Sequence, residues 1–467
     1  MAERTTFHSL EIFLNNQPTI KYVPPSAPEF HSFRNVWNSS HAGVPLAIVQ
    51  PQSASDVAAL IKFAKNRSLH FTLRSGGHNL QGRSVVDNAL LIDLRALNTV
   101  TIAPDRQSAT VGGGILQGDL ATKLWEAGLA TPTGAVPSVG YAGWATYGGY
   151  GPFSSHWGLG VDQVIGATIV NADGEIETAE EELLQGIRGA GGLYGAIVDL
   201  TIKVYPLTGI LAGPIIFDSS DIAKTFVDFN IAYNALLATE GLPAQATVQR
   251  VVFNTPRGRV FAITFVWSGS AAESEEGKRW SAKIAALVPC QMNAVVPTTI
   301  PKWFASNGAH IPTSVYGSSR TYNLASISNA TAEAIGRNLA LLPSDPAAMF
   351  TVHQLRGPSV DGTLTKPLSV FATREPHYML EILGYATSGV DQGASEAWAA
   401  QMAAEIELAG QGDILPTAYV SLYGPGPTES PDKVLEKVYG SKAEVVRLLK
   451  ARVDPENTFR LAVPTLD

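Results

Sequence analysis

The sequence contains a single cysteine, Cys290, among 467 residues. One thiol excludes an internal disulfide and any CxxC metal or redox motif. The count is compatible with a reducing compartment, and we expect no metal site.

Concentrated charge is also missing from the chain. Its 33 basic and 41 acidic residues give a formal net charge of −8, and no run of Lys or Arg occurs. This composition argues against nucleic acid or an anionic membrane as a partner. Glu3, Arg4 and Glu11 stand close together near the start, which has no apolar segment long enough for a signal peptide. We therefore expect a cytoplasmic protein, or else the processed form of a secreted one.

Residues 127–161 contain no Asp, Glu, Lys or Arg. Such a run resembles a membrane span, but its many glycines and prolines make a spanning helix implausible. Residues 133–151 are too rich in glycine for a helix and too aromatic for a linker. We predict that their backbone amides and rings surround a large, flat ligand.

The familiar phosphate-binding and metalloprotease motifs are absent. No GxGxxG follows a predicted strand, and neither GxxxxGK[ST] nor HExxH occurs. This disfavours a nicotinamide-type Rossmann domain. The chain has instead three glycine-rich turns, at 74–79, 134–151 and 188–192. In the first, two glycines that permit a tight turn and close backbone approach precede an imidazole, which predicts a phosphorylated ligand beside a nucleophile.

Hydrophobic periodicity predicts two kinds of unit along the chain. Up to residue 206, strands and helices alternate, with helices near 57–64 and 116–126 and a hairpin over 164–178. After 207 the pattern favours an antiparallel sheet with helices on one side. Its expected strands are 248–253, 260–267, 349–356 and 378–385, and its expected helices are 270–287, 331–342 and 395–409. We predict domains at 1–206 and 207–415, with 416–467, including a helix at 431–452, returning to the first.

Eight motifs occur in a fixed order. They are Arg-Ser-Gly-Gly-His at 74–78, Val-Gly-Gly-Gly at 111–114, Pro-Ser-Val-Gly at 137–140, Gly-Gly-Tyr-Gly at 148–151, Gly-Leu at 158–159, Ala-Asp-Gly-Glu at 172–175, Arg-Gly-Ala-Gly-Gly at 188–192 and Asp-Pro-Glu-Asn-Thr-Phe at 454–459. Together they resemble the berberine bridge enzyme-like oxidases, FAD enzymes of the vanillyl-alcohol oxidase and p-cresol methylhydroxylase (VAO/PCMH) superfamily. The resemblance is close over 45–206 and looser over the last fifty residues. It implies an α+β, two-domain VAO/PCMH-type flavoprotein.

The resemblance also implies a cofactor site. In that family the histidine of the first motif carries FAD through the flavin 8α-methyl carbon, which makes His78 the implied attachment point. The neighbouring backbone would hold the pyrophosphate, and Ile197 and Val198 match the adenine end. The implied cofactor-binding residues are Arg74, Ser75, Gly76, Gly77, His78, Asn79, Pro137, Ser138, Val139, Gly140, Gly143, Gly148, Gly149, Gly151, Ile197 and Val198.

Two positions near the flavin carry further information. Many family members have a second covalent link from a cysteine before Pro-(Ser/Thr)-Val-Gly, where this chain has Val136. We therefore expect one covalent link, at His78. Val139 matches the small gate residue of the oxidase members, which favours O₂ as the electron acceptor.

The catalytic region departs from the family pattern. The Tyr-x-Asn-Tyr strand of the family matches 419–422, but here Ser421 replaces the asparagine and Leu422 the second tyrosine. Tyr419 keeps the first tyrosine position, and Tyr423 lies one residue beyond the second. Strand alternation in 351–356 separates His353 from Arg356, so only one of them can line a pocket. The candidate catalytic residues are Tyr419, Tyr423, His353 and Arg356.

We expect an FAD-dependent oxidase of a small, fairly apolar specialised metabolite. Hydride would pass to flavin N5, and O₂ would be the acceptor. The alternative is a flavin-containing isomerase or cyclase with no net redox change, which the missing tyrosine makes credible. No feature of the sequence fixes the oligomeric state, and a monomer is the default.

Overall fold

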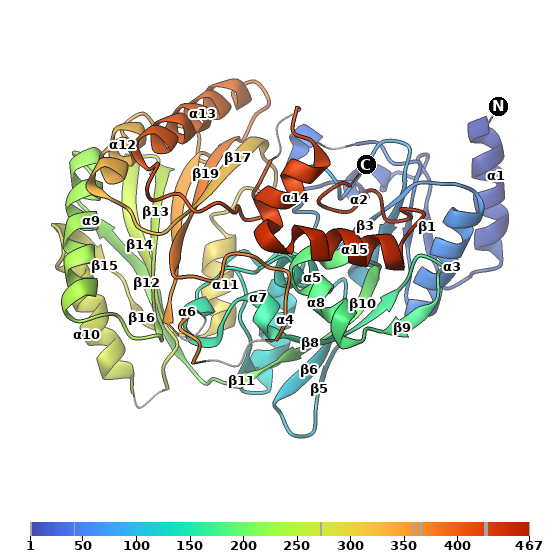
Figure 1. The fold of residues 1–467 in the computed structure, drawn as a ribbon, viewed down its shortest axis with the longest axis horizontal. Helices are drawn as coiled ribbons and strands as arrows, with labels where there is room; N and C mark the ends of the chain where they lie inside the picture. Colours follow the sequence, from blue (N-terminus) through green and yellow to red (C-terminus); the bar gives the residue numbers. More distant parts are fainter. Residues whose placement is uncertain are drawn as a thin grey trace.

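The computed structural model describes residues 2–41, 43–270, 273–357, 360–363, 367–424 and 428–466. Its first half holds a four-stranded sheet in the order β1-β2-β4-β3. These strands are β1 (Lys21–Val23), β2 (Ala47–Gln50), β4 (Leu90–Asp93) and β3 (Phe71–Arg74). Figure 1 labels β1 and β3 of this sheet. β3 is an edge strand of this sheet and runs parallel to β4. At the end of β3 the chain turns directly into the first glycine-rich motif.

A five-stranded antiparallel sheet completes the strand framework of this half, in the order β5-β6-β10-β8-β9. Its members are β5 (Val100–Ile102), β6 (Ser108–Gly112), β10 (Ala196–Lys203), β8 (Val164–Val170) and β9 (Ile176–Thr178). β8 and β9 pair antiparallel, and Gly174 in their turn has φ +74°, so the predicted hairpin is confirmed. A short pair, β7 (Leu129–Ala130) and β11 (Tyr205–Pro206), lies beside the sheet.

Helices cover these sheets. They are α1 (Ala2–Asn15), α2 (Phe30–Phe33), α3 (Ala54–Asn66), α4 (Gln117–Glu126), α5 (Tyr141–Thr146), α6 (Ser154–Trp157), α7 (Gly160–Gln163) and α8 (Glu181–Ala190). The two predicted helices correspond to α3 and α4. The Ser53 side chain accepts from the Asp56 N–H and caps α3, while Gly128, with φ +68°, follows the end of α4.

The uncharged stretch 127–161 is folded and largely buried. Our expectation that 133–151 holds no helix is wrong, because α5 forms between its glycine clusters. Tyr141, Ala142 and Ala145 on α5 are buried in the main core, and this packing outweighs the unfavourable composition. Among the described residues, no helix is both long and apolar enough to cross a membrane.

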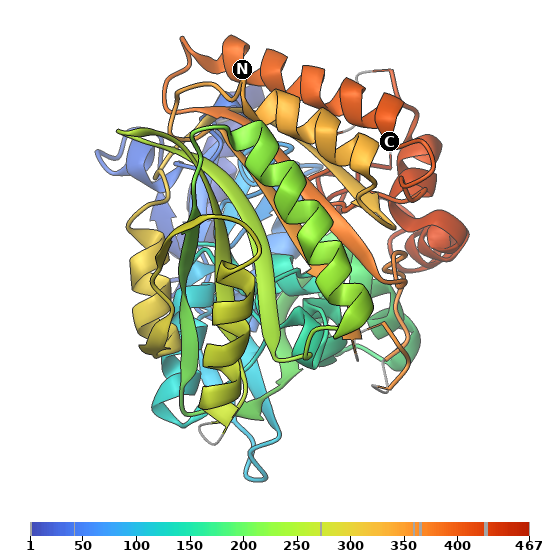
Figure 2. The ribbon, with the colours of Figure 1, turned by 90° about the vertical axis from the view of Figure 1, so that its left-hand side faces the viewer.

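The second half is built on an eight-stranded antiparallel sheet, as predicted. Its strands are β15 (Cys290–Asn293), β12 (Ile210–Phe217), β14 (Gly258–Trp267), β13 (Ala246–Thr255), β18 (Met349–Leu355), β19 (His377–Ala386) and β17 (Tyr316–Leu324), with β16 (Val296–Thr298) beside β12. Helices α9 (Ile222–Thr239), α10 (Ser274–Ala285), α12 (Asn329–Leu339) and α13 (Gln392–Ala409) lie on one face of the sheet (Figure 2). α11 (Ile300–Gly308) packs against α4 of the first half.

Side-chain alternation decides which residues of this sheet reach a site. On β13, Val248 and Val252 are buried in the core that includes the covering helices, so Gln249, Val251 and Phe253 point to the opposite face. That uncovered face looks toward the first half of the chain (Figure 1).

The C-terminal segment packs on the first half. The single helix predicted over 431–452 is wrong, because the chain forms α14 (Pro431–Tyr439) and α15 (Ala443–Val453). Gly440, with φ +51°, ends α14 in a conformation that glycine adopts readily. Leu435 and Val446 join the core of the first half, and Figure 1 shows both helices in red against it. The domain limits at 206 and 415 stay predictions.

Candidate functional site

A cavity of about 1210 Å³ lies between the two halves. From the first half, it is lined by the turn at 75–79, by the residues around Gly143, and by Gly192. Strands β13, β18 and β19 line it from the second. The chain therefore places its glycine-rich turns opposite the uncovered face of the large sheet.

The turn after β3 has the properties of an anion site. Gly77 has φ +72°, and a Cβ on Gly76 would lie 2.3 Å from the Gly140 backbone nitrogen, so glycine is required where the two turns pack. In the described part of the chain, no backbone N–H from Gly76 to Asn79 donates a hydrogen bond. Successive free N–H groups in such a turn bind a phosphate well.

The floor of the cavity fits a large, flat group. Gly143 and Gly192 line it, and a Cβ on either would meet no atom within 4 Å, so the ligand can approach the backbone there. Gln117 also lines it, and its buried Nε2 has no partner among the described residues. These features match FAD, whose pyrophosphate and ring system need an anion site and a flat bed.

A buried ion pair supports the turn. Arg74 Nη2 lies 2.6 Å from Asp93 Oδ2, and the two side chains are 1% and 0% exposed. Arg95 also contacts this carboxylate at 2.6 Å. Burial opposes ionisation of Asp93, but the hydrogen bond from Arg95 and the charges of Arg74 and Arg95 hold its pKa below the usual value. The guanidinium of Arg74 is thus engaged with protein groups, and it fixes the end of β3.

This pair gives a stability prediction. We expect Asp93→Asn to lower the free energy of unfolding by about 3–5 kcal/mol at pH 7, because it leaves two buried or half-buried cations without a counterion. Because the pKa of Asp93 is lower in the folded than in the unfolded protein, its carboxylate stabilises the folded state at pH values above the unfolded pKa. This stabilisation is lost as the pH falls through the folded pKa. The deficit of the variant should therefore shrink in acid, measured by urea unfolding between pH 7 and pH 3.

An exposed ion pair is the control for that measurement. Lys62 and Glu175 form a pair whose side chains are 47% and 65% exposed. We expect Lys62→Gln to change the unfolding free energy by less than about 1 kcal/mol. Equal losses in the two variants would show that the Asp93 pair does not support the turn.

His78 lines the cavity and is held by two neighbours. Its ring stacks on Trp37 with centroids 5.5 Å apart and an interplanar angle of 19°, and its Nε2 lies 2.9 Å from Ser138 Oγ. Burial lowers the pKa of the imidazole to about 4, so the ring is neutral at pH 7. Within the described residues Nδ1 has no hydrogen-bond partner, so a neutral ring with its proton on Nε2 leaves the Nδ1 lone pair available.

The place of the second flavin anchor is apolar. Val136 lines the cavity, and Cys290 is exposed on β15 at an edge of the large sheet. Since Cys290 is the only cysteine in the sequence, no thiol can form a thioether in this cavity.

The predicted cofactor residues fall into two groups. Those that line the cavity are Arg74, Ser75, Gly76, Gly77, His78, Asn79, Val139, Gly140, Gly143 and Ile197. Those that do not are Pro137, Ser138, Gly148, Gly149, Gly151 and Val198. Members of the second group pack behind the lining: the Gly149 N–H donates to the Tyr419 hydroxyl, and the Val198 carbonyl accepts from Gly113. The role of each residue toward FAD stays a prediction.

Glu381 lies on the sheet side of the cavity, and sequence reasoning missed it. It pairs in register with Thr351, whose Oγ1 donates to Glu381 Oε2 at 2.8 Å. His353 Nε2 lies 3.5 Å from Glu381 Oε1. Burial opposes ionisation, yet the His353 charge and the hydrogen bonds from His353 and Thr351 hold the pKa of Glu381 below its usual value. A lone carboxylate in the apolar stretch 378–385 was the signal available in the sequence.

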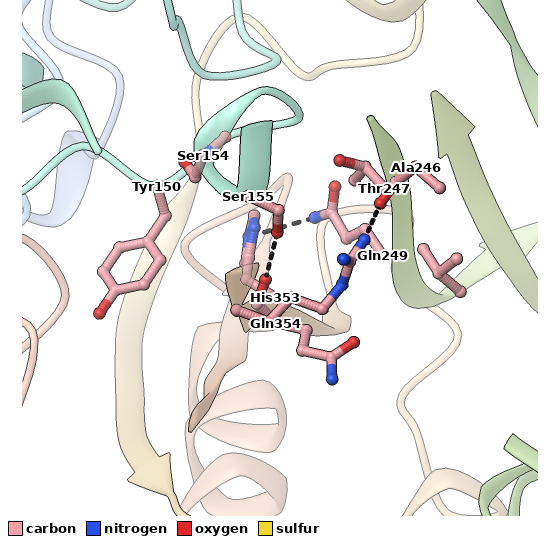
Figure 3. A pocket seen from close by; sticks show the side chains of 11 residues that line it. Tyr150, Ser154, Ser155, Ala246, Thr247, Gln249, His353 and Gln354 are labelled. Carbon is pink, nitrogen blue, oxygen red and sulfur yellow. Dashed lines mark hydrogen bonds between the residues drawn. The ribbon is translucent and has the colours of Figure 1, made fainter. Parts of the chain in front are cut away.

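His353 also borders a second, water-sized cavity of about 10 Å³ (Figure 3). Gln249 Nε2 lies 3.1 Å from His353 Nε2, and Ser155 Oγ donates to the Gln354 carbonyl at 3.4 Å. Arg356 lines this small cavity, does not line the large one, and donates to the carbonyls of residues 242, 243 and 246. The prediction that only one of His353 and Arg356 lines a pocket is wrong, because both border the small cavity; β18 ends at Leu355, so strand alternation does not extend to Arg356. Of the two, His353 also lines the large cavity.

The segment 419–423 is a turn, so its predicted strand is wrong. The N–H groups of Leu422 and Tyr423 both donate to the Tyr419 carbonyl, which closes the turn. Tyr419 lines the large cavity and packs on Tyr150 with centroids 4.9 Å apart, and burial raises its pKa to about 12. Tyr423 does not line the cavity, because its hydroxyl donates to Glu429 at 2.7 Å.

Tyr150 is a further tyrosine of the cavity whose side-chain role the sequence did not indicate. Its hydroxyl lies 2.7 Å from His377 Nε2, and His377 Nδ1 lies 2.7 Å from the Glu375 carbonyl. Because a carbonyl only accepts, Nδ1 carries the ring proton and the Tyr150 hydroxyl donates to Nε2. Burial raises the pKa of Tyr150 well above its usual value, which makes this phenol a hydrogen-bond donor.

Comparison with known proteins accounts for this arrangement. Residues 45–180 match the model of an FAD binding domain. FAD-linked oxidoreductase aurO of Gibberella zeae is 31% identical over 445 residues, which span 95% of this chain and 85% of that protein. The chain belongs to the FAD-linked oxidoreductases. The expected resemblance is confirmed: the chain matches an FAD binding domain and an FAD-linked oxidoreductase, and it shares the fold of berberine bridge enzyme. FAD is the cofactor of this FAD-linked oxidoreductase.

Other relatives agree with the assignment. (R)-6-Hydroxynicotine oxidase of Paenarthrobacter nicotinovorans is 34% identical over 189 residues, 40% of this chain and 41% of that enzyme. The crystal structure of berberine bridge enzyme from Eschscholzia californica has a TM-score of 0.81 at 20% identity and covers 98% of this chain and 99% of that one. At 20% identity, this comparison shows that the FAD-linked oxidoreductase and berberine bridge enzyme share a fold.

Proposed function

We propose that this FAD-linked oxidoreductase oxidises a small, fairly apolar metabolite and passes the electrons to O₂. FAD held in this cavity would supply the hydride acceptor. The observation that carries the proposal is the ionised Glu381, held by His353 and Thr351 on the cavity wall opposite the glycine-rich turns. Leu383 and Met349, which also line the cavity, supply an apolar surface for the substrate.

Glu381 is the proposed general base. Oxidation by hydride loss also releases a proton, and a carboxylate within reach of the substrate takes it. His353 and Thr351 orient the two carboxylate oxygens. Tyr419 and Tyr150 remain protonated at neutral pH. The Tyr419 hydroxyl is the proposed hydrogen-bond donor into the cavity, because the hydroxyl of Tyr150 donates to His377 Nε2.

His78 is the proposed site of a single covalent link to FAD. Its neutral ring supplies the lone pair that attachment needs, and Ser138 holds the other nitrogen. Val136 removes the second anchor. Asn79 and its neighbours would bind the pyrophosphate through their free N–H groups.

Peroxide production tests the acceptor. In air, we expect one hydrogen peroxide to form for each molecule of substrate oxidised, measured with a peroxidase-coupled dye against product by chromatography. Turnover only with an artificial acceptor, and no oxygen uptake, would contradict O₂ as the acceptor.

An isomerase or cyclase is the second candidate. It is favoured by Leu422, which lines the cavity where the family has a second tyrosine. In such an enzyme Glu381 would move a proton between two substrate positions, and FAD would only polarise the substrate.

A further inference from the structure

Trp37 joins the flavin-attachment turn to the second half of the chain. Its ring stacks on His78, and the ring of Tyr385 on β19 packs edge-on against it with centroids 5.1 Å apart at 75°. Its backbone N–H donates to the Gly77 carbonyl at 3.0 Å, in the same turn as His78. Trp37 thus contacts the turn through both its ring and its backbone.

The orientation of Trp37 is set by the second half. Its indole Nε1 donates to the Pro312 carbonyl at 2.9 Å. The Val315 N–H donates to the Trp37 carbonyl at 2.8 Å, and the Ser39 N–H donates to the Val315 carbonyl at 2.7 Å. Residues 37–39 therefore pair with the segment that enters β17, which leaves the indole ring little freedom to turn.

A buried amide strengthens this pairing. Asn38, which is 2% exposed, donates through Nδ2 to the Gly317 carbonyl at 2.9 Å. Ser40 Oγ accepts from the Gly317 N–H at 2.8 Å. These bonds form only when the two halves of the chain are docked, because residues 38 and 317 belong to different halves.

We propose that Trp37 is a positioning residue for the covalent attachment of FAD, and that docking of the two halves precedes attachment. The proposal rests on the linkage at His78. The stacked indole covers one face of the imidazole, and Ser138 holds Nε2, so the ring keeps one orientation with Nδ1 available. A ring free to rotate would spend most of its time with this lone pair misdirected, which slows bond formation.

The attachment reaction balances with dioxygen as the oxidant. In the net reaction a bond forms between His78 Nδ1 and the 8α-methyl carbon. The methyl group and the imidazole each lose one hydrogen. Dioxygen takes up the two electrons and two protons and leaves as hydrogen peroxide. Trp37 takes no part in this chemistry, so its effect is on the rate of attachment.

The rate of attachment tests the proposal without any substrate. Apoprotein from a flavin-starved expression host is mixed with FAD in air, quenched in denaturant at intervals and separated on a gel whose flavin fluorescence is recorded. We expect Trp37→Leu to slow covalent incorporation about tenfold or more, and Trp37→Phe, which keeps a stacking ring, to stay within about threefold of the wild type. Asn38→Ala, which leaves the stack in place, should also slow it.

The outcomes separate this proposal from the linkage itself. The role of Trp37 would be overturned if Trp37→Leu incorporated FAD covalently at the wild-type rate. The same substitution made in His78→Ala should leave non-covalent FAD binding normal, which shows that the cavity is intact. Wild-type incorporation by Asn38→Ala would overturn the order of docking and attachment. Flavin fluorescence that stays on the denatured polypeptide of the single variant His78→Ala would overturn the linkage at His78. If Trp37→Leu does not fold, as judged by thermal unfolding, the rates of Trp37→Phe and Asn38→Ala decide.

Discussion

His78→Ala is expected to bind FAD and to lose all of it on denaturation. The free N–H groups from Gly76 to Asn79 and the glycine bed at Gly143 and Gly192 remain in the variant, so non-covalent binding persists. The only predicted nucleophile toward the flavin is gone. The measurement is flavin fluorescence of the polypeptide on a denaturing gel, together with the absorbance of the acid-soluble fraction.

Ser138→Ala is the matched control for this variant. It removes the partner of His78 Nε2 but keeps the imidazole. We expect it to retain covalent flavin at full incubation and to reach that level more slowly. Flavin that stays on the polypeptide of His78→Ala would contradict attachment at this residue.

Glu381→Gln is expected to lower the rate of flavin reduction by substrate about 10²–10⁴-fold, the range that a general base contributes. The amide keeps the shape of the side chain and its place beside Thr351 and His353, so the loss reports on proton transfer. The measurement is stopped-flow absorbance of the flavin under anaerobic conditions.

The pH profile makes the test of Glu381 sharper. Its folded pKa is held below the usual glutamate value, so the base stays ionised as pH falls from neutral to the ordinary titration range of glutamate. The wild-type rate should fall only when pH passes through this lowered pKa, and the variant should lack that step. Glu275→Gln, at an exposed pair on α10, is the control and should behave as wild type. A rate in Glu381→Gln equal to wild type would remove Glu381 from the mechanism.

The fold could be predicted where local patterns agree with packing. Alternation in 248–253 and 260–267 and the turn at Gly174 specify strands and a hairpin without help from distant residues. The errors arise where distant contacts decide. The core holds α5 together despite its glycine-rich surroundings, and a positive φ at Gly440 divides a helix that periodicity alone would continue.

The site was predictable on the cofactor side and only in part on the substrate side. The glycine turn at 74–79 carries its chemistry in consecutive residues, so its motif reveals His78. Glu381, His353 and Gln249 come together only through the register of β13, β18 and β19, of which β13 lies about a hundred residues before the other two. The spacing of residues along the sequence does not indicate how these strands pair. Tyr423 does not line the cavity because residues 419–423 form a turn and not the predicted strand.

Anaerobic mixing of the holoenzyme with its substrate tests the central claim most directly, which is that the flavin in this cavity is a redox reactant. Extracts fractionated by chromatography, or a panel of small aromatic metabolites, supply the substrate. We predict that the absorbance of the oxidised flavin near the visible maximum disappears in step with product formation, and that air restores it. Product formed in amounts exceeding the enzyme, with the flavin spectrum unchanged, would contradict oxidation and establish the isomerase or cyclase instead.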